Sequence, residues 1–127
     1  MHLSPESNIK KRRENHIELD MQVQKNLDLI SIQHSHIKEI SPFAFPIICK
    51  DEEKRSYYCQ QFAGSGIEIR PMIAGNIQNQ PFYKKYVDKS FSCPGADFLH
   101  NNSFYCGNYP ELNTADLELI KSCLFRI

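Results

Sequence analysis

The sequence has 127 residues, of which 41% are hydrophobic, so it is long enough for one globular domain with one core. Lys plus Arg and Asp plus Glu number 15 each, which excludes the strong field of one sign that attracts nucleic acid or an anionic membrane. No run approaches the roughly 18 apolar residues of a membrane span, and the first residues lack the apolar core of a secretory signal. We therefore expect a single domain over residues 1–127, in the cytoplasm, with neither nucleic acid nor a membrane as partner.

The N-terminal segment has the signals of a helix start. Ser4 suits an N-cap, Pro5 the first helical position and Glu6 the first turn. We predict a helix from Pro5 to about Leu27, within a linking segment 5–28 that precedes an α+β body over 43–127. Its predicted inner face consists of Ile9, Ile17, Met21 and Leu27.

A basic run, Lys10 to Arg13, lies near the start of this helix, where cations oppose the helix dipole. The conflict would be relieved if the helix began further upstream, so the run is an indication of truncation. A nucleic-acid patch is the functional alternative, but no aromatic residues or wider basic surface accompany the run. A solvated helix face is the preferred interpretation.

The middle of the chain alternates short strands with helices. We expect a short edge strand near Leu29 to Ile32, and the clearest strand at Phe43 to Cys49, where Pro46 demands an edge position or a bulge. Asp51 then caps a helix that runs to Ala63, with Gly64 as its stop. The apolar stripe of this helix is predicted to be Tyr58, Cys59, Phe62 and Ala63.

The second half continues the same pattern with shorter elements. We expect a strand at Ile67–Ile73 interrupted by Pro71, a helical turn at 82–87, a short helix from Pro94 to His100, and a strand at 104–106. A final helix, capped by Thr114, has one apolar face made of Leu117, Ile120, Leu124 and Ile127. The pattern predicts a two-layer α+β domain with a small, mostly antiparallel sheet.

The cysteines and histidines give weak signals. The five cysteines are an odd number without a Cys-x-x-Cys pair, so buried reduced thiols are the preferred interpretation over a cluster of Cys93, His100 and Cys106. His34 and His36 could share a surface metal, but two ligands alone bind weakly. We predict no metal site.

Two segments could contact a ligand. Arg70, at the end of a strand, could hold a carboxylate or phosphate through bidentate hydrogen bonds, and a structural ion pair is an equally good interpretation. The loop with Gly75, Asn76 and Gln80 offers close backbone approach and amides suited to sugar hydroxyls, with a plain turn as the alternative. Asn108 is a candidate polar contact near the same cleft.

Taken in series, three segments resemble the C-terminal small domain of the DegT/StrS-type nucleotide-sugar aminotransferases and their 3-dehydrase relatives: Gly64–Pro81, Pro94–His100 and Ser103–Pro110. The resemblance implies the small domain of fold-type-I pyridoxal-phosphate enzymes, preceded by a long helix and acting on sugars for lipopolysaccharide O-antigen. It implies substrate contacts at Arg70, Gly75, Asn76, Gln80 and Asn108, with a nucleotide-linked keto-sugar as substrate.

The resemblance also implies what the 127 residues lack. The family carries the Schiff-base lysine, the acid at the pyridine nitrogen and the ring-stacking side chain on a larger N-terminal domain. We therefore expect no catalytic residue and no bound cofactor in this chain alone, and a large domain supplied in trans. The alternative is a free-standing, non-catalytic binding or assembly module. A homodimer is expected from the apolar side chains Ile30, Ile32, Met72, Ile73 and Phe82.

Overall fold

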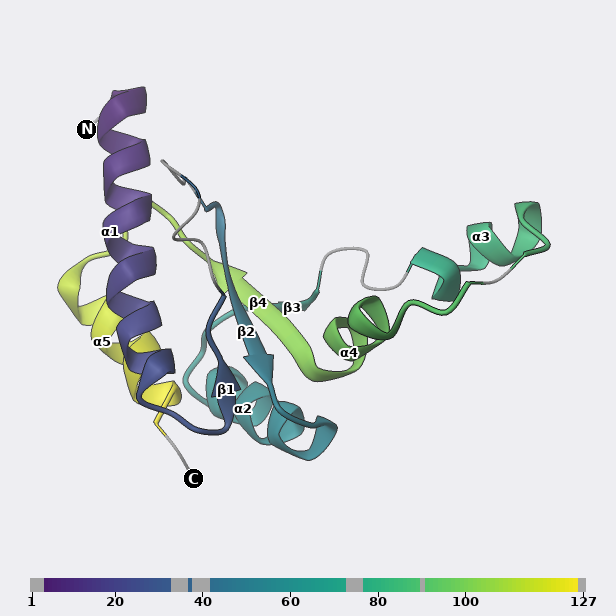
Figure 1. The fold of residues 1–127 in the computed structure, drawn as a ribbon. Helices are drawn as coiled ribbons and strands as arrows, with labels where there is room; N and C mark the ends of the chain where they lie inside the picture. The colour runs from purple at the N-terminus through teal and green to yellow at the C-terminus, as the bar shows by residue number, and fades with distance from the viewer. Residues whose placement is uncertain (1–3, 33–36, 38–41, 73–76, 90, 126–127) are drawn as a thin grey trace.

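A computed structural model describes residues 4–32, 37, 42–72, 77–89 and 91–125, and it has the two-layer α+β architecture that the sequence predicts. One layer is an antiparallel four-stranded sheet with the strand order β1-β2-β4-β3. Helices form the other layer (Figure 1). The elements in chain order are α1 Pro5–Gln24, β1 Leu29–Ile30, β2 Ala44–Cys49, α2 Glu52–Gly64, β3 Ile69–Pro71, η1 Ile77–Asn79, α3 Pro81–Tyr86, α4 Pro94–Asn102, β4 Ser103–Gly107 and α5 Thr114–Cys123.

Helix α1 begins as predicted but buries a different face. Ser4 accepts a hydrogen bond from the Ser7 N–H at 3.2 Å, and the helix ends at Gln24 rather than near Leu27. The predicted inner face is wrong, because Ile17 and Met21 are 46% and 55% exposed. The buried stripe consists instead of Asn15, His16, Leu19, Asp20 and Val23.

Asn15 and Asp20 can occupy this stripe because each has hydrogen-bond partners in the fold. Asn15 donates to Asn108 Oδ1 at 3.2 Å and to the Tyr109 carbonyl at 3.1 Å. Asp20 accepts hydrogen bonds at 2.8 Å from Ser31 Oγ. A buried polar group that is hydrogen-bonded no longer carries the full cost of its desolvation. The interior of α1 is therefore specified by hydrogen bonding as much as by apolar spacing.

The sheet accommodates a proline in an inner strand. Pro46 of β2 lies opposite Tyr105 of β4, while β1 spans only two residues and pairs with β2 at Ile48 and Cys49. Among the described residues, β2 therefore has a strand neighbour on one side only at Pro46. The predicted edge environment exists locally, although β2 as a whole lies between two strands.

The core lies between one face of the sheet and helices α1, α2 and α5. Phe45 and Ile47 of β2 and Phe104 and Cys106 of β4 project into it at every second position. Phe62 of α2 packs edge-on against Phe104, with ring centroids 5.3 Å apart. The helices contribute the remaining buried apolar side chains, including Leu19, Val23, Tyr58, Leu117, Ile120, Cys123 and Leu124.

Two helix ends differ from the prediction by one or two residues. Helix α2 includes Gly64, and the left-handed backbone conformation falls on Gly66, with φ of 76°, where a side chain would be strained. Helix α5 is capped by Asn113 rather than Thr114. Asn113 accepts from the Asp116 N–H and Asp116 accepts from the Asn113 N–H, which is a capping box.

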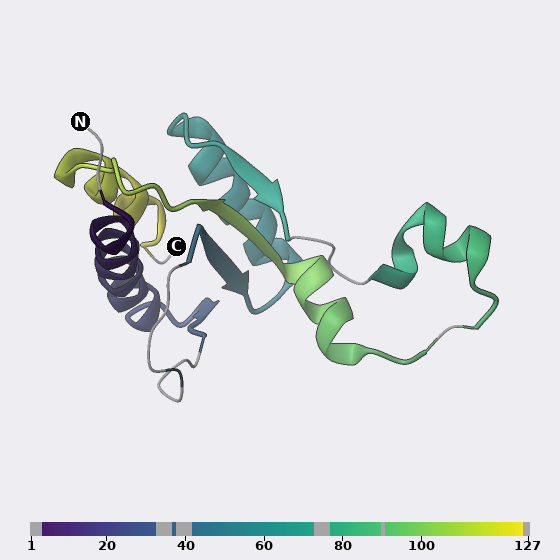
Figure 2. The same cartoon turned by 90° about the horizontal axis from the view of Figure 1, so that it is seen from above.

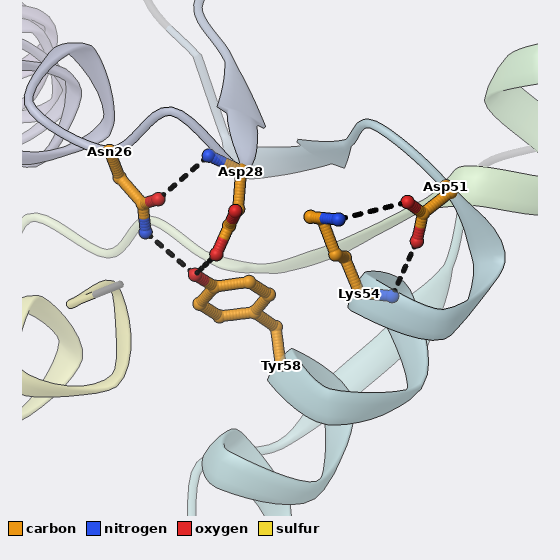
Figure 3. A network of polar contacts seen from close by, with 5 residues as sticks. All are labelled: Asn26, Asp28, Asp51, Lys54 and Tyr58. Atoms are coloured by element: carbon orange, nitrogen blue, oxygen red, sulfur yellow. Dashed lines mark hydrogen bonds and ion pairs between the residues drawn. The ribbon is translucent and has the colours of Figure 1, made fainter. Parts of the chain in front are cut away.

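A buried polar network joins the end of α1 to α2 (Figure 3). Tyr58 donates its hydroxyl proton to Asp28 Oδ2 at 3.0 Å, and Asn26 Nδ2 donates to the Tyr58 oxygen at 2.7 Å. Asn26 also donates to the carbonyl of Leu124 at 2.7 Å, which ties in the end of α5. Three helices thus meet at one satisfied polar cluster, which fixes their relative positions.

The segment 77–89 and 91–93, called the arm below, extends away from this body (Figures 1 and 2). It contains η1 and α3, and none of its described residues is buried. Its own hydrogen bonds give it shape. Gln78 Nε2 donates to the Phe91 carbonyl at 2.8 Å, and Tyr83 Oη donates to the Lys89 carbonyl at 3.0 Å.

Candidate functional site

Arg70 lies on β3, on the face of the sheet opposite the core. Its cross-strand neighbour is Tyr105, and the next residue in that row is Pro46. Arg70 Nη2 donates to Glu68 Oε1 at 2.8 Å, and the Arg70 side chain is 64% exposed. The structural ion pair, one of the two interpretations of Arg70 from the sequence, is therefore present. An exposed pair of this kind contributes little stability. A guanidinium has five N–H donors, so the pair does not exhaust Arg70.

Gln80 lines a cavity of about 400 Å³ beside the base of the arm. Residues of α2, including Glu52 and Arg55, form one wall, and His100 and Asn101 of α4 form another. Arg55 is held in place by a 3.0 Å hydrogen bond from its Nε to the Ser103 carbonyl. The lining is mostly polar, with charged, hydroxyl and amide groups suited to a hydroxylated ligand.

His100 was not expected beside Gln80, because twenty residues separate the two in the sequence. The chain leaves the sheet after β3, forms the arm and returns as α4, which brings His100 back to Gln80. No local sequence pattern predicts that α4 lies beside Gln80. The predicted residues Gly75 and Asn76 lie outside the described residues, so their loop remains a prediction.

Asn108 has a structural position. It is fully buried, and its Nδ2 donates to the carbonyls of Arg12 and Pro42, each at 2.9 Å. Its Oδ1 accepts from Asn15, and its N–H donates to the Phe43 carbonyl at 3.0 Å. Its side-chain amide and its backbone N–H are therefore used inside the fold, and these bonds join α1, the start of β2 and the end of β4. A substrate contact at Asn108 would require this junction to open.

A larger cavity, of about 510 Å³, is lined by residues of β3, β4 and α5 and of the segments next to them. Arg70 and Glu68 form part of its wall, together with Tyr105, Tyr109 and Arg12. Of the predicted site residues, Arg70 and Gln80 thus line two different cavities. Sequence reasoning missed Arg12, which it assigned to a solvated basic run.

The described cysteines are free thiols that are buried or half-buried. Burial raises the pKa of Cys49 and of Cys106 to about 12, so both are neutral at physiological pH. Within the described ranges, no three His, Cys, Asp or Glu side chains gather as metal ligands. No helix in the described part of the chain is long and apolar enough to span a bilayer.

The described lysines do not fit a pyridoxal phosphate site. A lysine that forms a Schiff base must be held unprotonated, which burial away from carboxylates achieves. None of the described lysines is buried. Hydrogen bonds to carboxylates raise the pKa of Lys121, which pairs with Glu118 and Glu18, and the Asp51 carboxylate raises that of Lys54. Both shifts favour the protonated, unreactive amine.

Comparison with known protein families agrees with the resemblance described from the sequence. The sequence model of the DegT/DnrJ/EryC1/StrS aminotransferase family matches residues 3–125. No curated protein matches the chain.

Solved structures share the fold. GDP-4-keto-6-deoxy-D-mannose-3-dehydratase from E. coli, solved with hydrated pyridoxal phosphate, superposes with a TM-score of 0.79 at 24% identity over 94% of this chain. A second structure, of a GDP-4-keto-6-deoxymannose-3-dehydratase variant with bound GDP-perosamine, also superposes with a TM-score of 0.79 at 24% identity. AtS13 from Actinomadura melliaura superposes with a TM-score of 0.78 at 17% identity over 94% of this chain. The chain spans 31% of the dehydratase chain and 30% of AtS13.

Proposed function

Because the chain belongs to the DegT/DnrJ/EryC1/StrS aminotransferase family, we propose that it forms the small C-terminal part of a nucleotide-sugar aminotransferase or 3-dehydratase. The observation that carries the proposal is the family match over residues 3–125, nearly the whole chain. The superposition on about a third of each solved enzyme supports the same assignment. The reaction would need pyridoxal phosphate, which supplies an electron sink for the substrate carbanion.

The cofactor would be held outside this chain. The described lysines support this view, because each is exposed or half-buried and none is fully shielded from water as a Schiff-base lysine must be. The 127 residues alone are then inactive, and activity returns when a large domain is present. As part of this proposal, the substrate is a nucleotide-linked keto-sugar for lipopolysaccharide O-antigen, and the assembled enzyme is a cytoplasmic homodimer.

Within this proposal, Arg70 and Gln80 bind substrate. The exposed guanidinium of Arg70 would hold a carboxylate or phosphate, and Gln80, with the predicted Gly75 and Asn76, would contact sugar hydroxyls. Asn108 supports the site indirectly, since it fixes the strand β4 that lies beside Arg70. The two residues bind and orient, and no step of bond breaking is assigned to them.

Complementation in trans tests this function. A fragment of the E. coli dehydratase that lacks its C-terminal third is mixed with the 127-residue chain, and loss of GDP-4-keto-6-deoxymannose is measured. We expect turnover only in the mixture, a loss of at least tenfold with Arg70→Gln, and no loss with Arg13→Gln, an exposed arginine on α1. A mixture without turnover would contradict the proposal.

A pyridoxal phosphate titration of the chain alone tests its incompleteness. Borohydride reduction followed by peptide mapping is expected to trap no single lysine. One specifically trapped lysine would mean that the small domain has its own cofactor site, and this part of the proposal would fail.

A second candidate is a non-catalytic assembly module. The observation that favours it is the arm, where Ile77, Phe82 and Phe91 are 49%, 53% and 63% exposed. Exposed apolar side chains that gather in this way are typical of a protein–protein interface. Self-association of the chain in analytical ultracentrifugation, together with failed complementation, would favour this candidate, whereas a monomer that complements would exclude it.

A further inference from the structure

The cavity between β3, β4 and α5 has features that the proposed function does not use. Its volume of about 510 Å³ lies in the range of small-molecule sites. Phe43, Ile67 and Leu112 give it an apolar wall, and Tyr105 and Tyr109 add two phenol rings. A ligand with a flat apolar body would find complementary surface here.

One cation in this cavity lacks a partner. Arg12 lies on α1 one turn before Asn15 and His16, so it continues the buried stripe of the helix. Its Nε is buried and has no hydrogen-bond partner, and no ion pair of Arg12 occurs among the described residues. Buried N–H donors are rarely left unpaired in folded proteins, so this one calls for an acceptor.

The carboxylates around the cavity are already engaged. Glu68 accepts from Arg70 at 2.8 Å, and Asp116 closes the capping box of α5 through the Asn113 N–H at 3.0 Å. Asp116 also lies at the positive end of the helix dipole, which compensates its charge. The charge that remains uncompensated at the cavity is the positive charge of Arg12.

Tyr109 forms part of the cavity wall and packs on Gly107. A Cβ built on Gly107 would lie 2.5 Å from Tyr109 Cε2 and Cζ, so the ring rests directly on the glycine backbone. The Tyr109 carbonyl is anchored by Asn15, while the residue is 56% exposed. Glycine at 107 thus leaves room for the phenol ring in the wall of the cavity.

From these features we propose that the cavity binds a small aromatic carboxylate, whose charge pairs with the Arg12 guanidinium and whose ring packs against Tyr109 and the apolar wall. Inorganic phosphate would meet the arginine but leave the aromatic wall unused, and a neutral arene would leave Arg12 unpaired. The site is separate from Gln80 and its cavity, while Arg70 forms part of its wall. The benzoate proposal does not depend on the proposed enzymatic function.

The test uses benzoate as the probe and the 127-residue chain as the receptor. Amide resonances of Gly66, Gly107 and Leu112 are followed by nuclear magnetic resonance during titration. We expect saturable shifts with a dissociation constant on the order of 1 mM, which is typical of so small a ligand. Benzyl alcohol and inorganic phosphate, titrated in parallel, should bind at least tenfold more weakly. Absence of saturable benzoate shifts, or equal binding of all three probes, would overturn the proposal.

Two arginines that are adjacent in the sequence supply the matched variants. Arg12→Gln should weaken benzoate at least tenfold, while Arg13→Gln, which removes the same charge from an exposed position, should leave the affinity unchanged. Equal effects of the two would mean that net charge alone attracts the anion, and the site would be rejected. Because Arg12→Gln alters a partly buried position, Gly107→Ala is the second probe. It displaces the Tyr109 ring and should weaken benzoate about threefold or more, whereas unchanged affinity would contradict the role of that ring.

Discussion

The body and the arm of this protein are ordered in different ways. In the body, α1, α2 and α5 enclose Phe45, Ile47, Phe62 and Phe104 against the sheet, and each of these side chains is almost fully buried. In the arm, none of the described residues is buried, although its hydrogen bonds hold η1 and α3 together. Burial of apolar surface is the main favourable term in folding, so the body contains its own driving force. The arm leaves Phe82 and Phe91 53% and 63% exposed.

The largest expected contrast comes from one substitution made in both regions. Phe62→Ala should lower the free energy of unfolding by about 3–5 kcal/mol, because it leaves a cavity next to Phe104. Phe82→Ala, at an arm position that is 53% exposed, should change it by less than about 0.5 kcal/mol. Urea denaturation followed by circular dichroism measures both. Similar losses would show that the arm is part of the cooperative unit.

A second prediction concerns the junction at Asn108. Asn108→Ala should cost about 2–3 kcal/mol of stability, because the carbonyls of Arg12 and Pro42 and the buried amide of Asn15 all lose a partner. Asn79→Ala, at an exposed position in η1, is the control and should be nearly neutral. If the two variants unfold at the same urea concentration, the junction is not a structural one.

A smaller loss is expected from the polar network in Figure 3. Tyr58→Phe removes the donor to Asp28 and the acceptor for Asn26 but keeps the ring, so about 1–2 kcal/mol should be lost. Tyr86→Phe, on a residue that is 75% exposed in the arm, removes the same hydroxyl as a control. Thermal denaturation should separate the two, and a stable Tyr58→Phe variant would mean that the network contributes no net stability.

The smallest expected effect is a dependence on alkaline pH. Burial raises the pKa of the Cys106 thiol from 9.0 to about 12, so the folded chain holds this proton more tightly than the unfolded chain. Its contribution to stability is therefore complete below pH 9 and is lost as the pH rises towards 12. Between pH 8 and 9.5 the free energy of unfolding should fall by about 1 kcal/mol.

Cysteine variants test whether this decrease in the free energy of unfolding comes from the body. Cys106→Ala should make it smaller, while Cys93→Ala, at a half-buried position where the arm ends, should leave it unchanged. Denaturation curves at the two pH values give the comparison. A fall that persists in full in Cys106→Ala would assign the pH dependence to other groups.

Local residue chemistry was enough to predict most elements of the fold. Asp51 starts α2 as an N-cap whose side chain accepts the Lys54 N–H at 2.8 Å, and the spacing of Leu117 and Ile120 places both in the core. Such signals act within one or two turns, so the sequence contains them completely.

Long-range pairing decided the rest. The apolar spacing of Ile17 and Met21 predicts the wrong face of α1, because Asn15 becomes buried only through Asn108 and Tyr109, more than ninety positions away along the chain. The two cavities also depend on long-range contacts. Gln80 and His100 line one cavity and Arg12 and Tyr109 the other, yet the residues of each pair are too far apart in the sequence for a local pattern to connect them.

The sequence by itself thus determined the elements, the two-layer class and the family resemblance, since each depends on residues that are near one another or on motifs in a fixed order. Tertiary structure alone decided which polar side chains became structural and which stayed at a surface. Asn108 and Arg70 are both polar residues of predicted ligand-binding segments, yet one is fully buried and the other is 64% exposed along its side chain. The physical reason is that a polar group can be buried only where the fold supplies its partners, and those partners come from distant parts of the chain.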